Sequence, residues 1–122
     1  MIKYSACGGM ATLEEIKAVC MRLQLDVDSW LVDFWRQRNG ALLNDQVLIY
    51  STVDIEERNA TFQVDEHFNG MVAVGDDSGG RLILIDRDGA SGLVLVDSGS
   101  GSLAGCERFK SMMELLAYIE EE

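Results

Sequence analysis

The residues best suited to chemistry are carboxylates that stand beside glycines in two short segments. Asp76 and Asp77 precede a Ser-Gly-Gly run, and Asp86 and Asp88 stand just before Gly89. Carboxylates next to glycine can bind calcium, but an EF-hand loop needs acids at alternate positions, a central glycine and a terminal glutamate. Both segments lack that pattern. We therefore interpret them as turns that carry solvated acids, and we expect no metal ion or other cofactor.

The sequence contains no recognisable catalytic constellation. His67 is the one histidine, and no nucleophile can be assigned beside it. Gly99, Gly101 and Gly105 do not have the spacing of a dinucleotide-binding loop, and no lysine follows a glycine cluster as it does in a phosphate-binding loop. We therefore expect that the protein is not an enzyme.

The three cysteines Cys7, Cys20 and Cys106 are widely spaced and include no Cys-x-x-Cys pair. An odd number at such spacing does not indicate a disulfide framework or a zinc site, so we predict buried free thiols.

Negative charge is the most informative property of the composition. The net charge is −11, and the segment 45–100 contains eleven acids against three bases. Such a surface repels nucleic acid and anionic membranes, and it speeds association with a basic partner. Solubility alone is the alternative explanation.

Size and hydropathy indicate one folded domain over residues 1–122, in which we expect the N-terminal segment 1–11 to be loosely ordered. A hydrophobic fraction of 48% is enough for a packed core. No apolar run approaches the roughly 20 residues that span a bilayer. The first nine residues lack a continuous apolar stretch, so we expect no signal peptide and a cytoplasmic protein.

Helical periodicity marks three segments. Thr12 to Glu15 form a capping box, and apolar residues recur after it at helical spacing as far as Leu23. A second helix is predicted to present an apolar face and to end at Asn39 with a left-handed Gly40; the members of that face are Val27, Trp30, Leu31, Phe34 and Trp35. A third helix is expected near the C-terminus, from about Phe109 to Ile119.

Four β-branched runs predict strands, at residues 47–50, 71–74, 82–85 and 93–96, with a helical turn at 53–58. Short connections favour antiparallel neighbours. The predicted fold class is α+β, a largely antiparallel sheet packed with two N-terminal helices and one C-terminal helix. Continuous apolar strands imply burial on both faces. A homodimer is one way to cover the second face.

The order of these motifs resembles the SUKH superfamily of bacterial immunity proteins and their Smi/Knr-like relatives. The resemblance begins at Thr12 and extends over nearly the whole chain. The matching positions are Thr12-Leu13-Glu14-Glu15-Ile16, the aromatic-rich helix with Trp30 and Trp35, Asn39-Gly40, the glycines Gly75, Gly79 and Gly80, the strand-ending Asp86, and Phe109. Val27 and Asp28 stand where leucine and proline are typical of the family, and Ala41 replaces a second glycine.

The resemblance implies an α+β immunity protein that binds and neutralises a cognate toxin domain, often a nuclease or a deaminase. A nuclease toxin is basic because it must hold phosphates, so an acidic protein can compete for that surface. We expect the charge to come from Asp65, Glu66, Asp76, Asp77, Asp86, Asp88 and Asp97. Tyr50 and Phe68 are expected as exposed aromatic residues that contribute to the interface. Asn39, Gly40, Gly75 and Gly80 are expected to be structural.

Two alternatives remain. The first is an intracellular adaptor of the Smi/Knr-like type that binds a host protein and has no toxin. The second is a small-molecule-binding module that uses a cleft between the second helix and the sheet, near Trp30 and Trp35.

Overall fold

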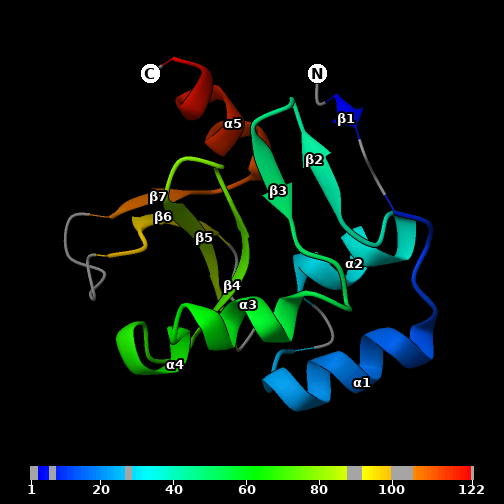
Figure 1. Ribbon diagram of the computed structural model, residues 1–122. Helices are drawn as coiled ribbons and strands as arrows, with labels where there is room; N and C mark the ends of the chain where they lie inside the picture. Colours follow the sequence, from blue (N-terminus) through cyan, green and yellow to red (C-terminus); the bar gives the residue numbers. More distant parts are fainter. Residues whose placement is uncertain (1–2, 6–7, 27–28, 88–91, 100–105, 122) are drawn as a thin grey trace.

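The computed structural model describes residues 3–5, 8–26, 29–87, 92–99 and 106–121, and shows an α+β fold built on one meandering sheet (Figure 1). Seven strands follow one another in chain order, and each pairs antiparallel with the next. The strands are β1 (Tyr4–Ser5), β2 (Ala41–Leu43), β3 (Val47–Ile49), β4 (Met71–Asp76), β5 (Arg81–Asp86), β6 (Leu93–Asp97) and β7 (Glu107–Phe109). The helices are α1 (Leu13–Leu23), α2 (Trp30–Gln37), α3 (Ile55–Thr61), α4 (Val64–His67) and α5 (Met112–Glu120). The predicted fold class is thus confirmed.

Helix α1 starts as its sequence predicts. The Thr12 hydroxyl accepts a hydrogen bond from the Glu15 amide at 3.2 Å, and the Thr12 amide donates to the Glu15 carboxylate at 3.4 Å. This reciprocal pair satisfies amides that have no partner within the helix. The buried stripe then consists of Ile16, Val19, Cys20 and Leu23.

Helix α2 differs from its prediction at its end and in its buried face. It ends at Gln37 rather than Asn39, although Gly40 does take a left-handed φ of +94°. The Asn39 side chain instead bonds to Thr52, with its Nδ2 donating to the Thr52 hydroxyl at 2.9 Å and its Oδ1 accepting from the Thr52 amide at 2.8 Å. These bonds hold the chain after α2 against the segment that leads into α3, which is why the helix stops early.

The buried face of α2 consists of Leu31, Val32 and Trp35. Trp30 was predicted to lie on that face, but it is 37% exposed, and Phe34 is only half-buried. Residues 30 and 34 lie one turn apart on one flank of the helix, while 31, 32 and 35 point into the core. Part of the apolar sequence of α2 therefore faces outward. Val27 lies outside the described residues.

The central strands β4, β5 and β6 contain the predicted apolar runs, and a single chain buries them on both faces. The side chains of Met71–Val74, Leu82–Ile85 and Leu93–Val96 are all nearly inaccessible to solvent. In Figure 1, α1, α3 and α4 lie on one side of the molecule and α5 lies on the opposite side. A second copy of the chain is therefore not needed to cover these strands, which removes the argument given above for a homodimer.

Gly75 is required where β3 and β4 approach each other. A Cβ placed on this residue would lie 2.2 Å from the Leu48 carbonyl oxygen, closer than any real contact. The register of the β4–β5 ladder also shifts between Ala73 and Gly75, as a β-bulge does. Gly75 therefore permits the close approach of β3 and β4, and Gly80 has the positive φ, +99°, that favours glycine in the following turn.

Candidate functional site

The most acidic part of the described structure is the pair of short helices α3 and α4. Acids stand in or just before the first turn of each helix, where the helix dipole favours negative charge. The members of this acidic helix pair are Asp54, Glu56, Glu57, Asp65 and Glu66. Arg58 is the one arginine or lysine in the same segment, 54–67. The helix pair therefore contributes more negative than positive side chains, with Arg58 Nε lying 3.7 Å from the Glu57 carboxylate.

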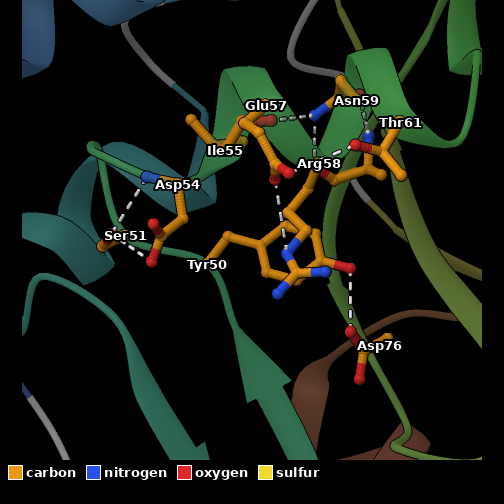
Figure 2. Close-up of polar contacts among 10 residues, drawn as sticks. Tyr50, Ser51, Asp54, Ile55, Glu57, Arg58, Asn59, Thr61 and Asp76 are labelled. Atoms are coloured by element: carbon orange, nitrogen blue, oxygen red, sulfur yellow. Dashed lines mark hydrogen bonds and ion pairs between the residues drawn. The ribbon is translucent and has the colours of Figure 1, made fainter.

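Asn59 attaches this helix pair to the sheet (Figure 2). Its Oδ1 accepts from the Ala73 amide at 2.8 Å, and its Nδ2 donates to the Ala73 carbonyl at 2.9 Å and to the Ile55 carbonyl at 2.8 Å. Strand β3 pairs with β4 at Gly75 and Asp76. The Asn59 amide thus supplies to Ala73 the donor and acceptor that a neighbouring strand would otherwise supply.

A second polar contact lies beside α3, at the end of β4. The buried Tyr50 hydroxyl donates to Asp76 at 2.9 Å (Figure 2). Burial raises the pKa of Tyr50 well above its usual value, and the charge of Asp76 and its hydrogen bond raise it further. Arg58 acts in the opposite direction but does not offset these effects. Tyr50 therefore stays a neutral donor at physiological pH, and it fixes Asp76.

A groove of about 410 Å³ separates α1 from the acidic helix pair. Two arginines cross it: Arg22 Nε lies 2.7 Å from Glu56, and Arg87 forms an ion pair with Asp65. Glu66 also lines the groove and is exposed, without an ion pair among the described residues. Both ion pairs have at least one largely exposed partner, so solvent weakens them. A lysine or arginine from another protein can compete for these carboxylates.

The acids expected to supply charge fall into two groups, at opposite ends of the sheet. Asp76, Asp77 and Asp97 lie where β4 and β6 end and β5 begins, whereas Asp86 lies where β5 ends, opposite Met71. Asp65 belongs to the second group, because its partner Arg87 follows Asp86 directly. Five residues of strand separate the two ends, a distance of about 17 Å. Asp88 lies outside the described residues.

Asp77 was expected to offer its charge to a partner, but it closes the β4–β5 turn instead. Its carboxylate accepts from the Gly79 amide at 2.8 Å, the Arg81 amide at 3.0 Å and Arg81 Nε at 2.6 Å. Only 5% of the side chain is exposed. Burial alone would raise the pKa of Asp77, but the hydrogen bonds from Arg81 and Gly79 together hold it below its usual value.

Tyr50 and Phe68 are not exposed, so the expectation that they serve as interface aromatics is wrong. They are 2% and 1% exposed, respectively. Tyr50 directly follows β3, and Phe68 directly follows α4. Both rings belong to the hydrophobic core. Removing such a ring from water is more favourable than leaving it on the surface.

Trp35 does not line an open cleft, which leaves little support for a small-molecule site beside it. It is fully buried, and its indole N–H donates to the Tyr50 carbonyl at 2.9 Å. The neighbouring pocket lined by Asn39, Gly40, Tyr50 and Arg58 measures about 170 Å³, below the roughly 300 Å³ of ordinary ligand sites.

Asp54, Glu56 and Glu57 belong to the acidic segment 45–100 but are not among the site residues predicted from the sequence. The available signal was their position in the predicted helical turn 53–58, since acids ahead of a helix belong to its exposed first turn. Asp77, by contrast, was predicted as a site residue, but its carboxylate has a role within its own turn.

The described residues include no group of three or more histidine, cysteine, aspartate or glutamate side chains that could hold a metal ion. Cys20 is buried, and its burial together with nearby Asp26 raises the pKa of its thiol. His67 is exposed and contacts Phe68 edge-on. In the same part of the chain, no helix has the length and apolar character needed to cross a membrane.

Compared with known proteins, the sequence matches no protein-family model and no curated protein.

Proposed function

We propose that this protein is an immunity protein of the SUKH type, which binds and neutralises a basic toxin domain through the acidic helix pair of α3 and α4. One observation carries the proposal: five acids and a single arginine within residues 54–67 lie on two helices that Asn59 fixes to the sheet. A fixed surface of predominantly negative charge steers an oppositely charged partner toward it.

The groove beside the helix pair gives the recognition a physical basis. Glu56 and Asp65 already bind the guanidinium groups of Arg22 and Arg87. Basic side chains of a toxin would replace these intramolecular partners, replace Arg58 at Glu57, and pair with Glu66. Because the same basic side chains would otherwise hold phosphates, their capture would block a nuclease or a deaminase acting on nucleic acid.

The resemblance to the family supports the proposal at positions that have a structural role in this chain. Asn39 bonds to Thr52, Gly40 has a positive φ, and Gly75 permits the approach of β3. The activity we propose is binding without catalysis, in the cytoplasm, where an immunity protein meets its toxin. A protein-interaction adaptor would use the same surface for a host partner, and the experiment below separates the two.

The test is co-expression with the C-terminal domain of the protein encoded directly upstream. Cells carry that domain under an inducible promoter, with this chain, without it, or with a Glu57→Lys/Glu66→Lys variant. We expect growth to be rescued by the native chain, with co-purification of the two proteins, and rescue to weaken for the variant. A neighbour that is harmless, or that kills cells in the presence of the native chain, would contradict the immunity function and favour the adaptor.

A further inference from the structure

Helix α2 and strand β1 form a partly exposed aromatic face outside the acidic helix pair, and Phe34 also packs against the core. The rings of Trp30 and Phe34 lie 5.3 Å apart, those of Phe34 and Tyr4 lie 6.5 Å apart, and the Arg38 guanidinium lies 3.8 Å from the centre of the Tyr4 ring. Trp30 and Tyr4 are 37% and 38% exposed. We call these four residues the aromatic face. Tryptophan, tyrosine and arginine are the residues that most often dominate the energy of protein interfaces.

Exposed apolar side chains and net charge are segregated along the chain. Among the described residues, five of the seven exposed large apolar side chains precede residue 31, namely Tyr4, Met10, Leu13, Met21 and Trp30. Residues 1–40 contain five bases and five acids, whereas residues 41–122 contain five bases and sixteen acids. The aromatic face therefore belongs to the part of the chain that has no net charge, and all of the −11 lies elsewhere in the sequence.

This segregation indicates what can bind the aromatic face. A basic partner gains nothing from a neutral surface that already presents Arg36 and Arg38. A second copy of the chain, by contrast, is repelled by its own acidic surface almost everywhere, and the repulsion is weakest where the net charge is zero. The aromatic face is where two copies can meet with the least electrostatic cost.

The exposed charged residues of α2 can pair with those of α2 in a second copy of the chain. Asp33 and Arg36 are both exposed, and neither forms an ion pair with a described residue. In a two-fold dimer, residue i of one copy meets residue j of the other, and j meets i. Two α2 helices packed antiparallel about the midpoint between residues 33 and 36 place Asp33 of each copy opposite Arg36 of the other.

We propose that the protein forms a two-fold homodimer through the aromatic face, with α2 packed antiparallel against α2 of the second copy. Trp30, Phe34 and Tyr4 supply the buried apolar area, and Asp33 and Arg36 set the register. Strand β1 is a two-residue edge strand, too short for the dimer to depend on extending the sheet.

Sedimentation equilibrium of the native chain tests the proposal over concentrations from about 1 μM to about 500 μM and at several salt concentrations. We expect a monomer–dimer equilibrium whose dissociation constant falls as salt rises, because screening reduces repulsion between two chains of charge −11. A chain that stays monomeric under all these conditions overturns the proposal. If the same chain requires Trp30 to co-purify with a toxin domain, the aromatic face belongs to that heterodimer instead.

Matched variants locate the interface. Trp30→Glu is expected to raise the dissociation constant at least tenfold, whereas Met113→Glu, at a 53% exposed methionine on α5, is expected to leave it unchanged. Arg36→Glu should weaken the dimer, and the double exchange Asp33→Arg/Arg36→Glu should restore it. A dimer that Met113→Glu disrupts and Trp30→Glu does not, or a double exchange no tighter than the single one, contradicts the proposed geometry. Circular dichroism of each variant verifies that it is folded.

Discussion

Asn59 of α3 takes the place of a neighbouring strand beside Ala73 of β4. Its carboxamide accepts from the Ala73 amide and donates to the Ala73 carbonyl, at 2.8 and 2.9 Å. One side chain thereby satisfies both backbone groups of a buried strand residue and sets the position of a helix that carries several acids. This contact therefore joins the proposed binding surface on α3 to the central sheet.

Replacement of Asn59 by alanine is expected to lower the free energy of unfolding by about 1–3 kcal/mol, since a buried amide and a buried carbonyl lose their partners. Urea denaturation measures the loss. Asn69→Ala, at an exposed asparagine, is the control and should change stability by less than about 0.5 kcal/mol. Equal stabilities of the two variants would show that Asn59 does not support β4.

The hydrogen bond between Tyr50 and Asp76 predicts a dependence of stability on alkaline pH. The pKa of Tyr50 is raised in the folded state, so below the unfolded value of about 10 the phenol is neutral in both states. Above pH 10 only the unfolded chain ionises at this position, and stability falls by up to about 1.4 kcal/mol per pH unit.

Tyr50→Phe removes this contribution to the slope of the free energy of unfolding against pH. We expect the variant to be less stable than the native protein at pH 8 by about 1–2 kcal/mol, because Asp76 loses a donor. The difference in stability between the two proteins should narrow as pH rises above 10. Urea denaturation between pH 8 and about pH 11 measures both quantities, and parallel stability curves for the two proteins would exclude a raised pKa at Tyr50.

The sequence predicted those elements whose pattern is strong and local. The capping box at Thr12 and the apolar runs of β4, β5 and β6 are found as expected, because a capping box and a continuous apolar run can both be recognised within a few consecutive residues. Strands β1, β2 and β7 have no more than three residues each. They exist because the neighbouring strand is already in place, a tertiary effect that no short sequence window contains.

The site was harder to predict than the fold. Acidic residues are abundant in the chain, and the sequence alone does not tell which of them are exposed. The Asp77 carboxylate accepts hydrogen bonds within its own turn, whereas Glu57 is exposed on α3. The burial of Tyr50 and Phe68 depends on how the chain turns after β3 and after α4. An aromatic residue next to polar neighbours gives the same local signal whether it faces solvent or the core.

The lowered pKa of Asp77 predicts that the protein loses stability at acid pH. Its pKa is lower in the folded state, so its contribution is complete above the unfolded value of about 4 and is lost as pH falls through the folded value. Asp77→Asn should therefore destabilise the protein at pH 7, by about 1–3 kcal/mol, and the difference should shrink below pH 4.

Urea denaturation from pH 7 to about pH 2 follows this difference. Asp97→Asn is the control at the same end of the sheet, because Asp97 is exposed and accepts one backbone hydrogen bond, from Gly99. The control should change stability by less than about 1 kcal/mol. A gap between the native protein and Asp77→Asn that stays constant to pH 2 would contradict the lowered pKa.

Charge reversal on the acidic helix pair predicts a kinetic effect on the proposed toxin complex. Glu57→Lys/Glu66→Lys is expected to reduce the association rate with the upstream-encoded domain by about tenfold or more at low salt, because long-range attraction governs encounter. The effect should diminish as salt increases, since the Debye length falls from about 30 Å at 0.01 M to about 8 Å at 0.15 M.

Asp97→Lys/Glu107→Lys is the matched control, because it applies the same change in net charge to exposed acids of β6 and β7, outside the acidic helix pair. Stopped-flow or surface-based kinetics measure both variants. If the association rates fall equally, the attraction comes from total charge rather than from α3 and α4. The double reversal removes two of the five acids of the helix pair and leaves the contacts of Asn59 in place. An association rate that falls more for this variant than for the control would assign the encounter surface to the helix pair.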